Sequence, residues 1–250
     1  MTSTLPISET FVSVQGEGKL VGVPSAFIRL SGCNLRCAWC DTPYASWSPE
    51  RSVRAIDELV EFVRESGVGH VVLTGGEPMM FDGLCELSAR LALSRELGGA
   101  GTHITIETAG TILPRAISPE LPLTCHLMSI SPKLANSTPT GDPRDPTGAL
   151  AARHKAARIN LPVLLALLER FPSPLRQLKF VVTGPADLGE IDALLAELPG
   201  VAPGDVLLMP EGVAPPAPAL KDLVLAACMS RGFRYGHRLH IELFGHVRGT

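Results

Sequence analysis

Three cysteines, Cys33, Cys37 and Cys40, lie close together in the chain, whereas its other cysteines lie far away in sequence. Spacings of four and then three residues indicate a shared metal site. A structural zinc site normally closes its tetrahedron with a fourth Cys or His, whereas a four-iron cluster can leave one iron without a protein ligand. That iron can bind and reduce a small molecule. No second Cys or His pair follows before His70, so the spacing favours a cluster over a zinc knuckle or three buried thiols.

Further motifs surround the cysteines. They read Glu9-Thr-Phe-Val-Ser-Val-Gln15-Gly-Glu17-Gly, Pro24-Ser-Ala-Phe-Ile-Arg29-Leu-Ser-Gly, Trp39-Cys40-Asp41-Thr42 and Thr74-Gly-Gly-Glu77-Pro. The cysteine spacing is typical of the radical S-adenosylmethionine (SAM) superfamily. Together with the other motifs, it resembles the 7-carboxy-7-deazaguanine synthases, and weaker similarities continue to the C-terminal part of the chain.

The resemblance implies a lyase-type enzyme with a 4Fe-4S cluster on Cys33, Cys37 and Cys40, and with SAM and Mg²⁺ as further cofactors. It implies that 6-carboxy-5,6,7,8-tetrahydropterin becomes 7-carboxy-7-deazaguanine and ammonia, towards queuosine and related 7-deazapurines. The cofactor carries the difficult chemistry: reductive cleavage of SAM gives a 5′-deoxyadenosyl radical that removes the C6 hydrogen, and SAM is then regenerated. The implied partners are the pterin, a flavodoxin-type or other reductant, and a second copy of the chain in a homodimer.

The resemblance also assigns roles to matching residues. Thr42 would ligate Mg²⁺, although its hydroxyl could instead cap the following turn. The implied SAM contacts are Trp39, Gly76, Glu77, Glu107, Ser131, Pro132, Lys133 and Gln177. The implied substrate contacts are Val14, Gln15, Gly16, Glu17, Arg29, Thr74, His240 and Thr250, the last through a terminal carboxylate.

Residue chemistry supports several of these roles and leaves alternatives open. The glycines of 15–18 let backbone amides approach a ligand, but the same stretch could be a plain hairpin turn. Arg29 lies in an apolar strand and needs a partner, either a substrate carboxylate or a protein carboxylate such as Glu17. Glu77 could accept from the SAM ammonium group. His240 could be a ligand or a hydrogen-bonded residue of a strand.

The remaining pattern predicts the elements that position these residues. Six short apolar runs each end in polar, Gly or Pro residues, at 25–31, 70–74, 103–107, 125–130, 177–182 and 205–209. Helical patterns over 57–66, 84–97, 162–171 and 188–198 separate most of them. We therefore expect an α/β fold in one radical SAM domain over residues 1–250. It would be an incomplete TIM-like βα barrel of about six parallel strands, with the site at their C-terminal ends.

Two further segments carry weaker signals. The alternation in 238–244 predicts a final strand. The Pro-rich segment 138–148 predicts a loop that either covers the site or is an inert surface insertion, and we favour the insertion.

Composition excludes other classes of function. The net charge of −3 and pI near 6.2 provide no basic field for a nucleic-acid backbone. The longest apolar stretch, 161–168, is far shorter than the ~20 residues of a membrane span. The N-terminal stretch has no leader pattern, so we expect a cytoplasmic protein. Cys85, Cys125 and Cys228 lie in apolar or helical surroundings and are expected to be core thiols.

Two alternative functions remain open at this point. A radical SAM activase that installs a glycyl radical in a partner protein can share the cysteine spacing. The interior Arg29 and the loop 15–18 instead favour a small carboxylated substrate. A non-enzymatic metal-binding module would be a colourless zinc protein, whereas a cluster would colour the protein brown.

Overall fold

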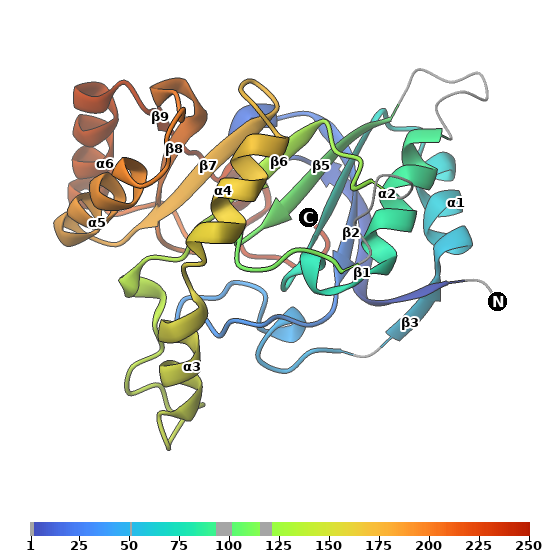
Figure 1. The fold of residues 1–250 in the computed structure, drawn as a ribbon, viewed down its shortest axis with the longest axis horizontal. Helices are drawn as coiled ribbons and strands as arrows, with labels where there is room; N and C mark the ends of the chain where they lie inside the picture. The colour runs from blue at the N-terminus through green and yellow to red at the C-terminus, as the bar shows by residue number, and fades with distance from the viewer. Residues whose placement is uncertain (1–2, 51, 94–101, 116–121) are drawn as a thin grey trace.

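One sheet organises the chain in this computed structural model, which describes residues 3–50, 52–93, 102–115 and 122–250 (Figure 1). Its strands, in the order β3-β1-β2-β4-β5-β6-β7-β8-β9, are listed here with their bounds. They are β1 Thr4–Val14, β2 Pro24–Leu30, β3 Ser52–Ala55, β4 His70–Gly75, β5 His103–Thr108, β6 Leu127–Ile130, β7 Arg176–Val182, β8 Val206–Pro210 and β9 Arg234–Tyr235.

The sheet is a partial TIM-like barrel, as the sequence predicts. β2 and all strands from β4 to β9 are parallel, and β1 pairs antiparallel with both β2 and β3. The six predicted strands correspond to β2 and β4 to β8. Among the described strands, β3 and β9 form the two edges and do not pair with each other, so the barrel stays open.

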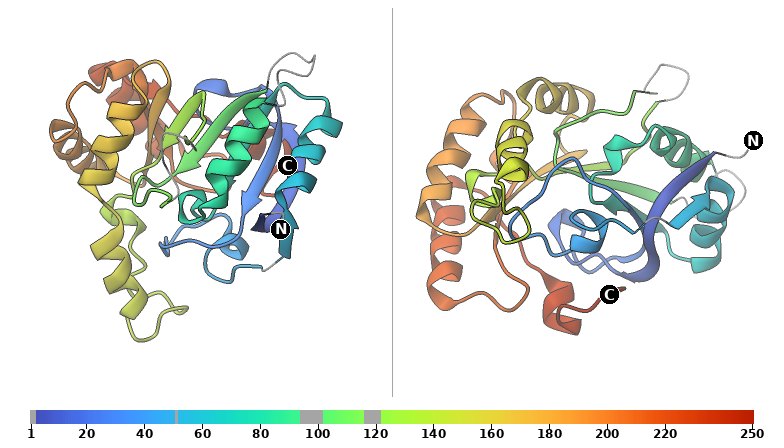
Figure 2. Two further views of the ribbon diagram at one scale, coloured as in Figure 1. Left: turned by 45° about the vertical axis from the view of Figure 1, so that its right-hand side comes forward. Right: turned by 90° about the horizontal axis from the view of Figure 1, so that it is seen from below.

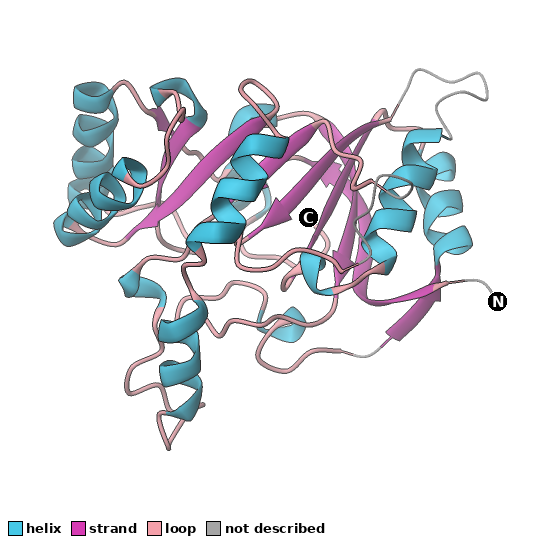
Figure 3. Cartoon of the chain, in the orientation of Figure 1, coloured by secondary structure: helices cyan, strands magenta, loops and turns pink. Residues whose placement is uncertain are grey.

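Most of the helices cover one face of this sheet (Figures 1 and 3). Their bounds are α1 Ile56–Ser66, α2 Gly83–Leu93, α3 Ala149–Ala157, α4 Leu161–Arg170, α5 Pro185–Ala196, α6 Pro218–Arg231 and α7 Leu239–Phe244. The apolar pattern did not predict α3 or α6, and α3 projects beyond one end of the sheet. Residues 94–97 of the helix predicted over 84–97 lie outside the described residues. None of the helices in the described ranges is long and apolar enough to span a bilayer.

The first helix shows why these segments fold locally. Ile56, Leu59 and Val63 recur at helical spacing and are buried against the sheet. Acidic residues occupy the first turn, where they favour the positive end of the helix dipole. Gly67, at φ 67°, ends the helix in the left-handed conformation, which glycine adopts without strain.

The two faces of the parallel strands have different roles because strand side chains alternate. Residues such as Ile28, Leu73 and Ile106 point to the helices and form the core. Residues of the opposite parity face the inside of the barrel, and they include Arg29 and Lys179. The alternation therefore places apolar side chains on one face and the polar residues of the site on the other.

The predicted C-terminal strand over 238–244 is wrong, because this segment contains the short helix α7. The amide of Leu239 donates to the carbonyl of Gly16 at 2.9 Å, which ties the segment to the loop after β1 rather than to a sheet edge. Ile241 is buried, whereas Leu243 and Phe244 are exposed. Alternation over so few residues does not distinguish a strand from one turn of helix.

Candidate active site

A cavity of about 400 Å³ lies inside the barrel, lined by the loop after β1, the cysteine segment, inward-facing strand residues and the C-terminal segment. Most of the predicted site residues line it. They are Val14, Gln15, Gly16, Glu17, Arg29, Cys33, Cys37, Trp39, Cys40, Thr42, Thr74, Gly76, Glu107, Ser131, Lys133, His240 and Thr250.

The cysteine loop, residues 33–42, is hydrogen-bonded to α3 and to the segment that precedes α3. The amide of Ala38 donates to the Ser137 carbonyl at 2.9 Å, and the amide of Arg36 donates to His154 Nδ1 at 3.1 Å. The other ring nitrogen of His154 shares a hydrogen bond of 2.8 Å with the Ser137 hydroxyl. Burial lowers the pKa of His154 to about 4, so its ring is neutral and can accept from the loop.

The Pro-rich segment 138–148 is a loop, as the sequence predicts, and it packs against the cysteine loop. Arg144 donates to the carbonyl of Ala38 at 2.9 Å, and its guanidinium carbon lies 3.9 Å from the ring centre of Trp47. Trp47 in turn donates from its indole nitrogen to the carbonyl of Cys37 at 2.9 Å. The segment therefore contacts the cysteine loop directly.

A partly buried group of charges joins the loop after β1 to distant parts of the chain. Glu17 pairs with Lys179 of β7 and, at 2.9 Å, with Arg238 before α7. Arg238 also pairs with Asp41 of the cysteine loop. Burial alone would raise the pKa of Glu17, but the charges of Lys179 and Arg238 outweigh it and hold that pKa well below its ordinary value. Glu17 is therefore ionised and holds three segments around the cavity.

Two further predicted residues meet at the ends of β4 and β5. The Thr74 hydroxyl donates to Glu107 Oε2 at 2.9 Å, and the Gln15 amide donates to Glu107 Oε1 at 3.3 Å. All three side chains line the cavity. Glu107 thus fixes the side chains of Thr74 and Gln15 in the wall.

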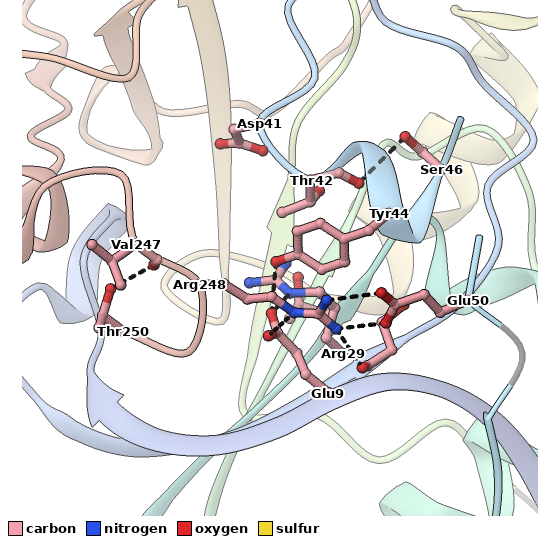
Figure 4. Close-up of polar contacts among 12 residues, drawn as sticks. Glu9, Arg29, Asp41, Thr42, Tyr44, Ser46, Glu50, Val247, Arg248 and Thr250 are labelled. Carbon is pink, nitrogen blue, oxygen red and sulfur yellow. Dashed lines mark hydrogen bonds and ion pairs between the residues drawn. The ribbon is translucent and has the colours of Figure 1, made fainter. Parts of the chain in front are cut away.

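Arg29 is paired with a protein carboxylate, but not with Glu17. Its Nε donates to Glu9 Oε1 at 2.7 Å, and both side chains line the cavity (Figure 4). The suggested pairing with Glu17 is wrong because Lys179 and Arg238 already occupy that carboxylate.

Comparison with known proteins connects this geometry to a family. The radical SAM superfamily model matches residues 27–162. The 7-carboxy-7-deazaguanine synthases of Rhodopirellula baltica and Halobacterium salinarum are 45% and 44% identical to this chain, over 99% and 98% of it and 90% and 93% of their own lengths. The chain belongs to the 7-carboxy-7-deazaguanine synthase family. The crystal structure of QueE from Escherichia coli matches the fold with a TM-score of 0.65 and 26% identity, covering 95% of each chain.

Radical SAM membership implies a 4Fe-4S cluster and SAM, and the cysteine loop of this synthase-family chain fits a cluster. Burial raises the pKa of Cys33 and Cys37 to about 12, so their thiolates require a neighbouring positive charge such as iron. The amide of Leu35 already donates to Cys33 Sγ at 3.4 Å. In the described ranges, no three His, Cys, Asp or Glu side chains are close enough to hold a single ion. In a 4Fe-4S cluster each cysteine binds a separate iron, and three cysteines on one loop suit such a group.

Three residues with implied SAM contacts do not line the cavity: Glu77, Pro132 and Gln177. Glu77 is fully buried, and its carboxylate accepts from the Thr108 hydroxyl at 2.7 Å and from the Ala109 amide at 2.8 Å. Burial raises the pKa of Glu77. In this member of the synthase family, Glu77 holds the loops after β4 and β5 together.

The sequence patterns indicate no role for several ionisable residues in the wall. They are Glu9, Asp41, Lys179, Arg238, His246 and Arg248. Lys179 interrupts an apolar strand as Arg29 does, and that signal could have identified it. Arg238 and Arg248 have no such signal in the sequence. They reach the site only because the C-terminal segment folds back towards β1 (Figure 2).

Proposed function

We propose that this chain is a radical SAM 7-carboxy-7-deazaguanine synthase that converts 6-carboxy-5,6,7,8-tetrahydropterin to 7-carboxy-7-deazaguanine and ammonia. The observation that carries the proposal is one cavity lined by three cysteine thiols and, on β2, by an arginine suited to a carboxylate. The near full-length relatives with this name support the same activity and do not favour a glycyl-radical activase.

The cysteine loop would hold the cluster through Cys33, Cys37 and Cys40. When bound, the cluster and SAM supply the radical chemistry. The chain itself binds and orients the two ligands and excludes water from the reacting atoms. The proposed SAM contacts that line the cavity are Trp39, Gly76, Glu107, Ser131 and Lys133.

The loop after β1 and the C-terminal ends of β2 and β4 form the substrate side of the cavity. The proposed contacts are Val14, Gln15, Gly16, Glu17, Arg29, Thr74, His240 and Thr250. Thr42 is the proposed Mg²⁺ ligand, and hydroxyl, carboxylate and water oxygens suit that ion. A homodimer, a flavodoxin-type or other reductant and a cytoplasmic location complete the proposal. Sedimentation of the anaerobic protein would test the dimer.

The deciding assay combines anaerobically reconstituted protein, reductant, SAM, Mg²⁺ and 6-carboxytetrahydropterin. Mass spectrometry should detect a product lighter by one ammonia, with SAM unconsumed. If only 5′-deoxyadenosine accumulated, the SAM site would stand and the proposed substrate would be wrong. Omitting Mg²⁺ should slow the reaction, and an unchanged rate would remove the role of Thr42.

A further inference from the structure

The position of Glu9 depends on an irregularity in β1. Ile7 pairs with Leu30, but the next pair is Glu9 with Arg29, so the register shifts at Ser8. Leu5 and Ile7 face the core, whereas Glu9 lines the cavity. A regular strand would keep all three on one face, because its side chains alternate with period two. The extra residue therefore turns Glu9 to the cavity, directly opposite Arg29.

The Glu9 carboxylate accepts hydrogen bonds from three parts of the chain (Figure 4). Oε1 accepts from Arg29 Nε at 2.7 Å and from the Tyr44 hydroxyl at 2.8 Å. Oε2 accepts from Arg248 Nε at 3.0 Å. Burial raises the pKa of Glu9, but the hydrogen bonds from Tyr44 and Arg29 outweigh it, and the net shift is downward. The carboxylate is therefore charged, and both of its oxygens are held by the protein.

Arg248 reaches Glu9 from the C-terminal segment and is itself held in place. Its two terminal nitrogens donate to Glu50, one at 2.8 Å and the other at 2.6 Å, and its guanidinium carbon lies 4.1 Å from the ring centre of Tyr44. It also donates to the Ser8 carbonyl at 2.9 Å, at the register shift. These contacts hold both the bulge and the carboxylate of Glu9 in place.

The arrangement leaves one part of Arg29 available. Its bond to Glu9 uses Nε, and within the described residues its two terminal nitrogens donate no hydrogen bond. The side chain is 17% exposed and lines the cavity. Phe11, whose ring centre lies 5.9 Å from the guanidinium carbon, stacks on Phe27 beside it. A guanidinium fixed at Nε presents a planar pair of N–H groups suited to a carboxylate.

We propose that Glu9 is a positioning residue for Arg29: it binds Nε, directs the terminal nitrogens into the cavity, and is itself held by Tyr44 and Arg248. The substrate carboxylate binds to those terminal nitrogens. This inference rests on the proposed function, because it takes Arg29 as the residue that receives the substrate carboxylate.

The test compares two ligands on anaerobic, SAM-loaded protein: 6-carboxytetrahydropterin and tetrahydropterin without the carboxylate. Glu9→Gln preserves the size of the side chain but removes its charge. The Gln oxygen can still accept from Arg29, but the weaker, neutral hydrogen bond should raise the Kd of the carboxylated ligand about tenfold and leave the other Kd unchanged. Tyr44→Phe removes one donor to Glu9 and should raise the Kd of the carboxylated ligand by a smaller factor. This second variant tests the inference even if Glu9→Gln does not fold.

Other outcomes would overturn the inference. If Glu9 acted only as a nearby negative charge, Glu9→Gln would tighten binding of the carboxylated ligand. If its role were only structural, both ligands would weaken equally. Glu58→Gln, which removes an exposed carboxylate paired with Arg54, is the matched control and should change neither Kd.

The wild-type protein separates this inference from the proposed function. If it bound both ligands equally well, the assignment of Arg29 to the substrate carboxylate would fail, whatever the variants did. If it preferred the carboxylated ligand and Glu9→Gln kept the full preference, only the positioning role of Glu9 would fail.

Discussion

At two positions in the cavity wall, a neighbouring segment lies so close to the backbone that only glycine fits. A Cβ added at Gly16 would overlap the ring of His240, a side chain on the C-terminal segment. A Cβ added at Gly76 would meet the backbone oxygens of Gly32 and Ala45, which cannot move without disturbing the cysteine loop. At both positions the absence of a side chain lets two segments pack closely.

We predict that Gly16→Ala displaces His240 from the cavity wall and leaves the fold intact, since the obstacle is a side chain on the short helix α7. The KM for the pterin should rise by about tenfold or more, as a misplaced positioning group costs that much, while the KM for SAM stays unchanged. Steady-state kinetics would measure both values.

Gly189→Ala in α5 is the matched control, because nothing lies within 4 Å of the added Cβ. It should stabilise the protein by about 0.5 to 1 kcal/mol, the helix-propensity difference, and leave both KM values unchanged. Equal kinetics in the two alanine variants would show that the contact between Gly16 and His240 has no role in substrate binding.

At the scale of elements, α3 and the segment before it support the cysteine loop. His154 accepts from the Arg36 amide and bonds to Ser137, whose carbonyl receives the Ala38 amide. A loop that must hold three thiols around a cluster gains rigidity from such contacts, as metal sites do from the groups behind their ligands.

We predict that His154→Ala leaves the buried Ser137 hydroxyl and the Arg36 amide without this partner. The local cost is about 1 to 3 kcal/mol, which should lower iron content and speed cluster loss in air, while the secondary structure measured by circular dichroism stays intact. Arg153→Ala, an exposed neighbour, should retain wild-type iron content. A His154 variant with full iron and an unchanged rate of cluster loss would contradict this role.

At the scale of the whole molecule, a buried histidine links stability to pH at the end of the sheet away from the cavity. His70 bonds to the Ser25 hydroxyl at 2.7 Å and to the Thr105 hydroxyl at 2.8 Å, joining β2, β4 and β5. Burial, assisted by the charge of His103, lowers the pKa of His70 from 6.5 to about 4. The unfolded chain therefore binds more protons than the folded chain between these two values.

It follows that His70 contributes stability that is present above pH 6.5 and is lost as the pH falls towards 4. Urea unfolding at pH 7 and pH 5 should show a loss on the order of 1 kcal/mol from this residue. His70→Gln should be less stable at pH 7 but should lose less between the two pH values. An identical pH dependence in the variant would exclude His70 as its source.

Features of the protein that depend on local spacing could be predicted from its amino-acid sequence. The cysteine spacing, the six inner strands and the polar residues after them follow from short-range pattern, and the structure brings most of these residues to one cavity. This works because parallel strands end at the same edge of a barrel, so strand order alone gathers the residues that follow them.

The pairing of the charged residues depends instead on the three-dimensional fold. Period two would place Glu9 with Ile7 on the core face, and only the register shift at Ser8 turns it to Arg29. Arg238, just before α7, reaches Glu17, and Arg248, after α7, reaches Glu9, because the C-terminal segment folds back beside β1 and the loop after it. In the same segment, residues 239–244 form a helix rather than the expected strand. Such contacts join residues far apart in sequence, and local patterns carry no information about them.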